Sequence, residues 1–313
     1  MPEGHSIHRL ARQFGDVFVG RRLSVSSPQG RFAQGAALLD GRVLEAASAH
    51  GKQLFLQFGG GLVLRVHLGL YGAWEFGGDA TFRGASSIGA PRRVGERELA
   101  DDGARQPSAA PPPPRGAVRA RLVSENGWAD LRGASACVVE TAEEAAAVRA
   151  RLGPDPLARA AAGEQQASDG ADAAEFARRL TRRRAPVARL LMDQEVVAGI
   201  GNVYRAELLF RARLDPFTPG TALGTERALA LWEDAAAAMA EGVRDGRIVT
   251  TGPQFWIGGS GSLPGPEDAH YVYRRHGMPC RVCGTAVTMA AEAGRKLYWC
   301  TGCQAPDGTR GAI

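Results

Sequence analysis

Apolar residues recur at helical spacing near the start of the chain. Within residues 5–19, the apolar positions that share one helical face are Ile7, Leu10, Ala11, Phe14 and Phe18. Residues 43–76 instead alternate between apolar and polar positions and are interrupted by glycines, which is typical of antiparallel strands. The pattern therefore predicts a helix that leads into a set of short strands.

The alternation stops at residue 84 and resumes at residue 118. Residues 84–117 are rich in Pro, Gly, Ala and charged residues and have no periodicity, so we expect a mobile loop there. Strand-like patterns return in residues 118–131 and 136–141. Residues 1–150 are thus predicted to form one β-rich domain, which carries this loop.

The second half of the chain follows a different pattern. Residues 151–172 are predicted to be a linker, and helical periodicity runs through residues 173–270, with one helix at about 225–245 and a Gly/Pro loop at 250–270. Residues 271–313 hold four of the five cysteines. The expected fold class is α+β: a β-rich domain, a helical domain and a small terminal unit.

Composition sets the class of protein. The chain has 313 residues, of which 44% are apolar, and a net charge of +5. Because no apolar run approaches 18 residues and the start has no basic and apolar leader, we expect no membrane span, no secretory signal and a cytoplasmic location. The mild positive charge suits an anionic partner. The alternative is that the chain is rich in Arg and Ala because of a bias in genomic base composition. Only Lys52 and Lys296 are lysines.

The terminal cysteines form two C-x2-C pairs. The four cysteines are Cys280, Cys283, Cys300 and Cys303. This spacing matches a closed, tetrahedral zinc site that supports folding, and a redox dithiol is the alternative. The segment between the pairs predicts a β-hairpin whose tip carries Arg295 and Lys296, either as a phosphate contact or as a solvated basic turn. Cys137 lies in an apolar stretch and is predicted to be a buried small hydrophobe.

A small-residue turn precedes a second feature. In residues 193–210 a helix ends in the sequence AGIG, and Asn202 can cap the helix that follows. The free N–H groups and the positive dipole end of such a helix favour a phosphate. Five arginines in residues 178–184 add a candidate clamp for a nucleic-acid backbone. The alternative is an ordinary joint between two helices.

Two shorter motifs lie in the β-rich half. Lys52 follows Gly51 and precedes a strand, where it either reaches a cleft or remains a surface lysine. Leu70 and Tyr71 lie at an expected turn between strands. An apolar and aromatic pair on a turn can act as a wedge between bases, with core packing as the alternative.

Taken in order, these motifs resemble the formamidopyrimidine-DNA glycosylase / endonuclease VIII family. The segments that carry the resemblance are MPEG at the start, HGK at 50–52, HLGLYG at 67–72, RLGPDPL at 151–157, LLMDQEVVAGIGNVYRAELLF at 190–210 and YVYRRHGMPCRVCG…GRKLYWCTGCQ at 271–304. Gly4 and the LYG sequence resemble the endonuclease VIII branch, of actinobacterial type. The resemblance implies that the N-terminal domain is a β-sandwich flanked by helices and that the helical domain contains a helix–two-turns–helix element.

The resemblance also implies roles for individual residues. Pro2 would be the nucleophile once Met1 is removed, Glu3 the general acid/base, and Lys52 the proton donor in β-elimination. Arg295 would bind the phosphate beside the lesion and assist δ-elimination. The implied DNA-contacting residues are Gly69, Leu70, Tyr71, Arg151 and Asn202. One structural Zn2+ would be held by the four cysteines.

The function that follows is a bifunctional DNA glycosylase/AP lyase of base excision repair. We expect it to excise oxidised pyrimidines from damaged double-stranded DNA and to cleave the strand by β,δ-elimination. Single-stranded DNA is a further candidate substrate, and a monomer in the bacterial cytoplasm, at the nucleoid, is expected. The alternatives are oxidised purines, a non-catalytic DNA-binding relative and an RNA-binding zinc ribbon.

The chain departs from the family at three positions. His5 and Ser6 stand where the endonuclease VIII start usually has Pro-Glu, so a second carboxylate near the nucleophile is missing. His5 or His8 could compensate, but two histidines on a helix surface are the simpler expectation. Gly69 occupies a wedge position that is often polar, which weakens any expected contact with the base opposite the lesion.

Overall fold

The computed structural model describes residues 2–90, 108, 110–158, 170–257 and 263–305. The chain divides into two compact units, Met1–Arg151 and Leu152–Ile313. The terminal hairpin belongs to the second unit, together with the helices.

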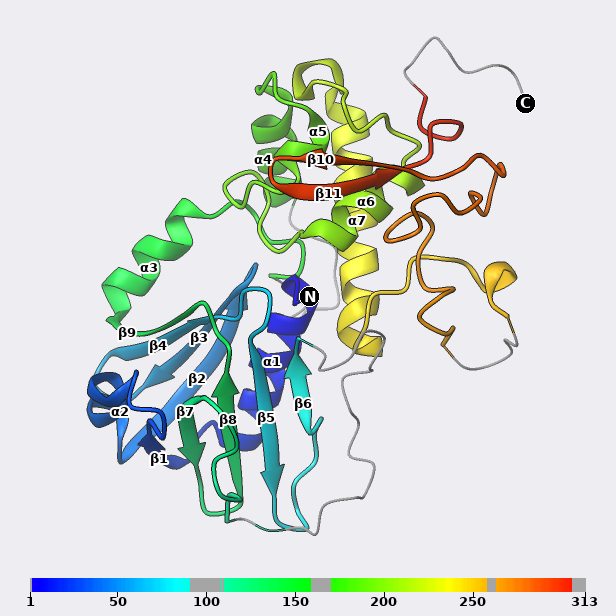
Figure 1. Ribbon diagram of the computed structural model, residues 1–313. Coiled ribbons are helices and arrows are strands. Elements are labelled where there is room, and N and C mark those ends of the chain that lie inside the picture. Colours follow the sequence, from blue (N-terminus) through cyan, green and yellow to red (C-terminus); the bar gives the residue numbers. More distant parts are fainter. Residues whose placement is uncertain (1, 91–107, 109, 159–169, 258–262, 306–313) are drawn as a thin grey trace. The chain divides into compact units, whose positions relative to one another are not determined.

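The first unit is built on one antiparallel sheet (Figure 1). Its strands are β1 (Arg22–Ser26), β2 (Arg42–His50), β3 (Gln53–Phe58), β4 (Leu62–His67), β5 (Ala73–Gly78), β6 (Ser87–Gly89), β7 (Val118–Val123), β8 (Gly127–Arg132) and β9 (Ala136–Thr141). They lie in the order β6-β5-β8-β7-β1-β2-β3-β4-β9. The predicted antiparallel strands between residues 43 and 76 are thereby confirmed.

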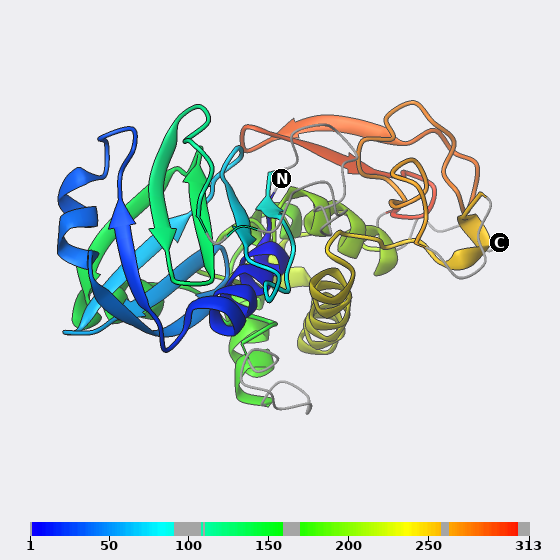
Figure 2. The same ribbon diagram turned by 90° about the horizontal axis from the view of Figure 1, so that it is seen from below.

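The two halves of this sheet enclose a single core. Helix α1 (Gly4–Phe18) packs against the sheet and contributes its predicted apolar face, including Phe14 and Phe18. Phe14 contacts Trp74 and Phe76 of β5 edge-on, at centroid distances of 4.9 and 5.3 Å. In Figure 2 α1 is seen in dark blue beside the sheet. Because side chains from β3 and β4 share this core with those from β5, β7 and β8, the prediction of a β-sandwich with a flanking helix is confirmed.

Two helices and one strand of the first unit differ from the sequence-based expectation. Helix α2 spans Ala33–Leu39, and α3 spans Ala142–Arg151. Strand β6 lies inside the segment predicted to be a mobile loop and pairs with β5, so the start of that segment belongs to the sheet. Most of the remainder lies outside the described residues.

Helix α3 has a sequence signal at its start. Thr141 accepts a hydrogen bond from the Glu144 backbone N–H at 3.1 Å, and the Glu144 carboxylate accepts one from Thr141 N–H at 2.8 Å. This reciprocal arrangement is a capping box, which fixes the first turn of a helix. Ala145 and Val148 then cover Phe55 on the outer face of β3.

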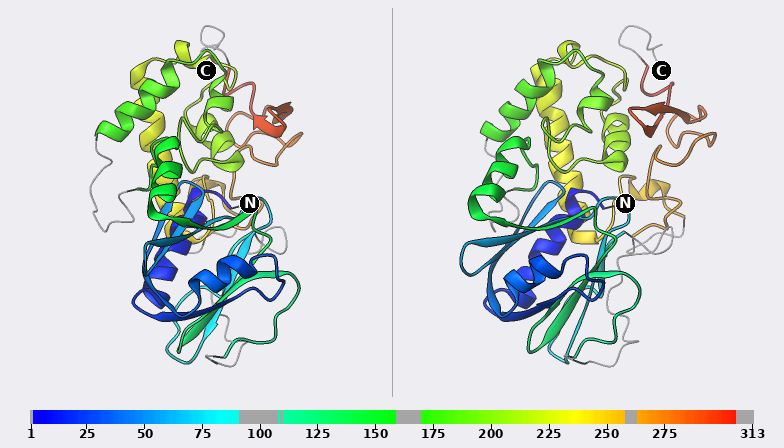
Figure 3. Two further views of the ribbon diagram at one scale, coloured as in Figure 1. Left: turned by 90° about the vertical axis from the view of Figure 1, so that its left-hand side faces the viewer. Right: turned by 60° about the vertical axis from the view of Figure 1, so that its left-hand side comes forward.

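The second unit contains the helices α4 (Gly170–Thr181), α5 (Val187–Leu190), α6 (Asn202–Arg211) and α7 (Thr225–Asp245), two 3-10 turns, η2 (Gly220–Ala222) and η3 (Pro253–Phe255), and the hairpin β10 (Thr288–Glu292) with β11 (Arg295–Trp299). Figure 3 shows α7 in yellow running through the unit, with the hairpin in red on the side opposite α4. Residues 159–169 of the predicted linker lie outside the described residues, but its first residue ends α3 and its last three begin α4.

One buried carboxylate ties α6 to the segment that leads into the hairpin. Glu207 is fully buried and accepts hydrogen bonds from three successive backbone N–H groups, those of residues 271–273, at 2.7–2.9 Å. Thr250 adds a fourth hydrogen bond at 2.5 Å. A buried carboxylate needs several hydrogen bonds to compensate for its lost hydration. These bonds therefore fix the position of residues 271–273 against α6.

None of the helices in the described ranges is both long enough and apolar enough to cross a membrane.

Candidate active site and metal centre

The predicted nucleophile lies directly before the first helix. Glu3 has extended backbone angles and occupies the N-cap position of α1, and both Pro2 and Glu3 are buried. The positive end of the helix dipole therefore lies beside Pro2. A cation at this position is disfavoured by about 0.3–1 kcal/mol.

Lys52 is placed by a two-residue turn between β2 and β3. His50 pairs with Gln53, so Gly51 and Lys52 form the turn, and Gly51 has a φ of 57°, a value that suits glycine. Lys52 is half-buried rather than fully solvated.

His67 is a neighbour of Lys52 that the sequence reasoning missed. It pairs with Gln53 across β3 and β4, at the same end of the sheet. Its pKa is lowered from the ordinary value, first by burial and then by the positive charges of Lys52 and Arg65. The sequence did contain a signal for His67, because this residue begins the HLGLYG motif and lies two positions before the predicted wedge.

Residues 69–71, called the wedge turn here, project apolar side chains. Leu70 is 46% exposed and Tyr71 is 81% exposed, which is unusual for residues of this kind. The alternative of core packing is therefore wrong for both. Gly69 has a φ of 68°, which places the turn in the left-handed region.

The histidines of α1 correct an expectation. His5 and His8 are 4% and 5% exposed, so they are buried and do not lie on a helix surface. Burial is the main cause that lowers the pKa of His5 to about 3, and the charge of Arg9 is the second. His5 is therefore neutral at physiological pH and does not supply the negative charge of the missing carboxylate.

This burial predicts a pH dependence of stability. Between pH 6.5 and pH 3 the unfolded chain takes up a proton at His5 that the folded chain does not. Stability is therefore fully present above pH 6.5 and falls as the pH decreases, by on the order of 1 kcal/mol per pH unit. We expect His5→Gln to flatten this part of a urea-denaturation pH profile, whereas the same change at the exposed His276 leaves it intact. Equal slopes in both variants would contradict the assignment to His5.

The turn before α6 is held by Gln194. Its side-chain amide donates to the carbonyls of Met192 and Ile200 at 3.1 Å each, and its oxygen accepts from Gly199 N–H. The AGIG segment, residues 198–201, can follow this tight path because it consists of Ala, Gly and a single larger residue, Ile200. All four residues are buried.

Asn202 has a different role from the predicted cap. Gly201 occupies the N-cap position, and no side chain caps the helix. Asn202 is the first helical residue. Its amide donates to the Lys296 carbonyl at 3.0 Å, and its oxygen accepts from the Arg205 guanidinium. Asn202 thus attaches α6 to the hairpin strand that begins with Arg295.

The arginine cluster is partly paired with nearby carboxylates. Arg178 and Arg179 share Glu175, at 2.5 and 2.6 Å, and Arg183 pairs with Asp193 at 2.6 Å. Arg182 and Arg184 are exposed. The cluster is therefore a weaker candidate for a phosphate clamp than its sequence indicates, because three of its five arginines already have a carboxylate partner.

The remaining predicted positions are exposed. Arg151 ends α3 in the first unit. Arg295 and Lys296 follow the two-residue tip of the hairpin in the second unit, as predicted. The structure brings Lys52 near His67, and Asn202 to the hairpin; each of these groupings lies within one unit.

The four cysteines form a metal centre at the base of the hairpin. Their sulfur atoms all lie within 4.8 Å of one another, with 3.8 Å between Cys280 and Cys303 and 3.4 Å between Cys283 and Cys300. Zinc–sulfur bonds of about 2.3 Å in a tetrahedron require sulfur separations near 3.8 Å, so the donor set and the geometry fit one structural Zn2+. The prediction of the metal site is confirmed.

Cys137 is separate from this cluster. It is half-buried against the core of the first unit, and burial raises the pKa of its thiol to about 12. The thiol stays protonated at neutral pH, in keeping with a packing role.

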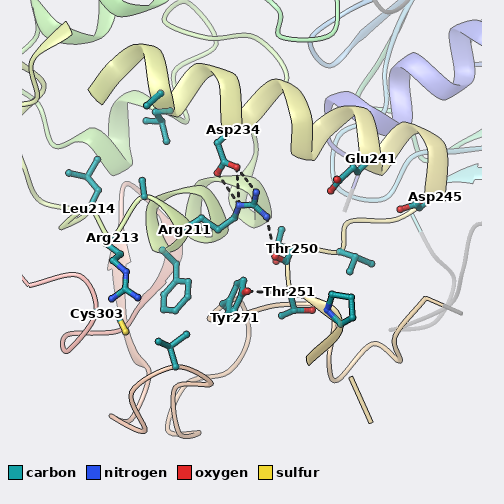
Figure 4. Close-up of a pocket in the computed structure, with 18 of the residues that line it drawn as sticks. Arg211, Arg213, Leu214, Asp234, Glu241, Asp245, Thr250, Thr251, Tyr271 and Cys303 are labelled. Atoms are coloured by element: carbon teal, nitrogen blue, oxygen red, sulfur yellow. Dashed lines mark hydrogen bonds and ion pairs between the residues drawn. The ribbon is translucent and has the colours of Figure 1, made fainter. Parts of the chain in front are cut away.

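A groove of about 810 Å³ lies in the second unit (Figure 4). Its wall is formed mainly by residues of α6, α7 and the segment 249–256. Arg211 crosses it to pair with Asp234 at 2.5 Å and to donate to the Thr250 carbonyl. Of the residues predicted from the sequence, only Cys303 lines it. The groove is therefore distinct from the predicted catalytic positions.

The comparisons agree with this arrangement over nearly the whole chain. Residues 1–133 match the formamidopyrimidine-DNA glycosylase N-terminal domain, residues 152–252 match the H2TH domain of the same enzymes, and residues 277–306 match the zinc finger found in FPG and IleRS. The chain is 43% identical to "Endonuclease 8 1" of Mycobacterium tuberculosis over 304 residues, which cover 97% of this chain and 100% of that protein.

Solved structures share the fold. The MutM (Fpg) protein of Thermus thermophilus superposes with a TM-score of 0.65 at 28% identity, covering 99% of this chain and 100% of that one. A Lactococcus lactis Fpg mutant in complex with Fapy-dG DNA has a TM-score of 0.69 at 18% identity, covering 97% and 100% of the two chains, and supports the fold alone.

The β-sandwich, the H2TH helical unit and the four-cysteine zinc finger together define a DNA glycosylase of DNA repair. The chain belongs to the formamidopyrimidine-DNA glycosylase / endonuclease VIII family.

Proposed function

We propose that this chain is a bifunctional glycosylase and AP lyase that excises oxidised pyrimidines from double-stranded DNA. The observation that carries the proposal is the position of Pro2 and Glu3, buried together at the positive end of α1. A secondary amine and a carboxylate in one buried site are the two groups that imine chemistry at a sugar carbon requires.

The reaction begins once Met1 has been removed. The neutral Pro2 nitrogen attacks C1′ of the damaged nucleotide, the bond from C1′ to the base breaks, and the base leaves with a proton. Glu3 supplies and removes protons while the sugar ring opens. Because the amine is secondary, the product is an iminium ion that carries a permanent positive charge. A retained Met1 would place the nitrogen in an amide, which is not nucleophilic.

The iminium ion then drives strand cleavage. It withdraws electrons from C2′, a proton is lost there, and the 3′ phosphate leaves by β-elimination. Lys52 is the proposed proton donor for this step. A second elimination releases the 5′ phosphate, and Arg295 at the hairpin tip is proposed to bind and stabilise the departing phosphate.

The exposed wedge turn accounts for access to the target carbon. C1′ cannot be reached while the nucleotide is stacked, so the damaged nucleotide must leave the duplex. Leu70 and Tyr71, which are exposed despite being apolar, are proposed to fill the vacated space. Arg151, Asn202 and Gly69 are proposed as further DNA contacts. Binding to a polyanion would place the protein at the nucleoid of a bacterial cell, and binding should weaken steeply with salt.

The assignment to oxidised pyrimidines follows the relative named endonuclease 8, with which the chain shares 43% of residues. The same chemistry on oxidised purines is the second candidate, because proteins named formamidopyrimidine-DNA glycosylase also match, among them one from Thermus thermophilus that is 39% identical over 154 residues.

Borohydride trapping tests both parts of the proposal. We expect purified protein lacking Met1 to form a covalent adduct with an abasic-site duplex when the imine is reduced. We also expect a thymine-glycol duplex to give more adduct than an 8-oxoguanine duplex. The reverse order would reassign the substrate to purines. Tight DNA binding without any adduct would instead indicate a non-catalytic relative.

A further inference from the structure

The wedge turn rests on the short connection between β8 and β9. The Ser135 backbone N–H donates to the His67 carbonyl at 2.9 Å, and the Ser135 hydroxyl oxygen lies 2.9 Å from the same carbonyl. The same hydroxyl lies 2.6 Å from His67 Nδ1. Three contacts from one serine therefore converge on His67, which lies two residues before the turn.

The packing between these two segments is also close. A Cβ atom added at Gly69 would lie 2.9 Å from Ser135 Cβ, and one added at Gly133 would lie 2.6 Å from the Tyr71 carbonyl. Gly69 and Gly133 also have positive φ values, of 68° and 60°. The wedge turn is thus seated on residues 133–135 at both ends, with no room for movement toward them.

The hydroxyl geometry favours one of the two His67 tautomers. A serine hydroxyl has one hydrogen, and we assign it to the His67 carbonyl, because the two oxygens lie 2.9 Å apart and would repel each other without a hydrogen between them. The oxygen can then only accept from Nδ1, so Nδ1 carries a hydrogen. In the neutral ring, Nε2 consequently holds the lone pair. The ring is neutral at physiological pH, because burial and the charges of Lys52 and Arg65 lower the pKa of His67.

We propose that Ser135 is a positioning residue that seats the wedge turn and fixes His67 as the Nδ1–H tautomer beside Lys52. The inference rests on the proposed function, since it assigns Ser135 a part in the base-displacement and elimination steps. The neutral ring offers Nε2 as a hydrogen-bond acceptor, and the Lys52 ammonium, whose charge acts on the ring, is a candidate donor. Ser135 itself does not touch the reacting atoms.

Removing the hydroxyl is expected to slow the reaction more than it weakens binding. Ser135→Ala keeps the backbone contact to the His67 carbonyl but removes the acceptor for Nδ1–H. We expect single-turnover base release and strand cleavage to slow by about tenfold, the value of one ordered hydrogen bond. We expect the Kd for the lesion duplex to change by less than about twofold, because the backbone N–H of Ser135 still holds the His67 carbonyl and keeps the wedge turn in place.

The matched control is Ser24→Ala. Ser24 is exposed on β1, which is separated from β4 by β2 and β3 in the sheet. Ser135→Thr restores a hydroxyl. Nitrogen chemical shifts of 15N-labelled histidine in the full-length, zinc-loaded protein report the tautomer directly. The expected pattern for His67 is a protonated Nδ1 in the wild type, loss of that preference in Ser135→Ala, and its return in Ser135→Thr together with the rate.

Several results would overturn the inference. One is a Ser135→Ala variant with the rates of Ser24→Ala. Another is a His67 tautomer that Ser135→Ala leaves unchanged. A third is a Ser135→Thr variant that regains the tautomer but stays slow. If the wild-type chain itself formed no imine adduct, the proposed function would fail, while the tautomer measurement would still decide whether Ser135 holds His67.

Discussion

A chain with a peptide fused ahead of Met1 is expected to form no borohydride-trapped adduct and to lose strand cleavage by a factor on the order of 10⁴ or more. The physical reason is local: the Pro2 nitrogen would be an amide, whose lone pair is delocalised into the carbonyl group. The loss should appear on abasic-site duplexes as well as on lesion duplexes, because both reactions pass through the same iminium ion.

DNA affinity provides the control for this experiment. The fusion alters no residue proposed to contact DNA, so filter binding to an uncleavable abasic analogue should stay within a few-fold of the untagged protein. Mass spectrometry of the untagged protein should show Pro2 as its first residue. An adduct of normal yield from a fusion protein confirmed to be intact would exclude Pro2 as the nucleophile.

Loss of the metal centre is expected to be the second large effect. Cys300 is fully buried, and its neighbours Leu297 and Tyr298 pack into the cores that the hairpin shares with the helices of the second unit. Cys300→Ser or removal of the metal by a chelator should unfold the hairpin, because such a small element cannot remain folded on its own core. Affinity for an abasic-site duplex should then fall by about 10- to 100-fold, the value of one lost charged phosphate contact.

Cys137 supplies the matched control for the metal experiment. Cys137→Ser likewise replaces a cysteine sulfur with oxygen, but in the first unit and outside the cluster. It should leave both the metal content and the DNA affinity close to those of the wild type. Metal content measured by atomic absorption should be one zinc per chain in this variant and none in Cys300→Ser. Undiminished DNA binding by a metal-free protein would show that the hairpin contributes no contact.

Elements with strong local patterns were predictable from the sequence. Helix α1 follows directly from its apolar spacing, and the hairpin β10–β11 from the two C-x2-C pairs. Helix α3 carried a readable capping box at Thr141 and Glu144, but its alanine-rich composition gave no clear apolar face, so its signal lay in polar residues.

The environment of each side chain was less predictable than the elements. His5 and His8 are polar residues at the start of a helix, and only the packing of the whole unit decides that they are buried. The arginine cluster gave the same kind of error, because Asp193 and Glu195 come next to Arg183 only after the turn between α5 and α6 has folded. Asn202 lies at the start of α6, but its contact with the Lys296 carbonyl joins residues 94 positions apart, which local reasoning does not reveal.

Helix α6 is attached to the terminal segment through its first turn and its middle. Asn202 and Arg205 hold the Lys296 carbonyl, and Glu207 holds the backbone of residues 271–273. The hairpin therefore cannot swing without the helix, and the separation between Asn202 and Arg295 is set by protein contacts rather than by DNA. If both residues bind phosphates, α6 fixes the distance between the two phosphate-binding positions along the DNA strand. The protein would then measure the distance between two phosphates, and a backbone stretched or compressed at the lesion would be recognised by its spacing before any base is read.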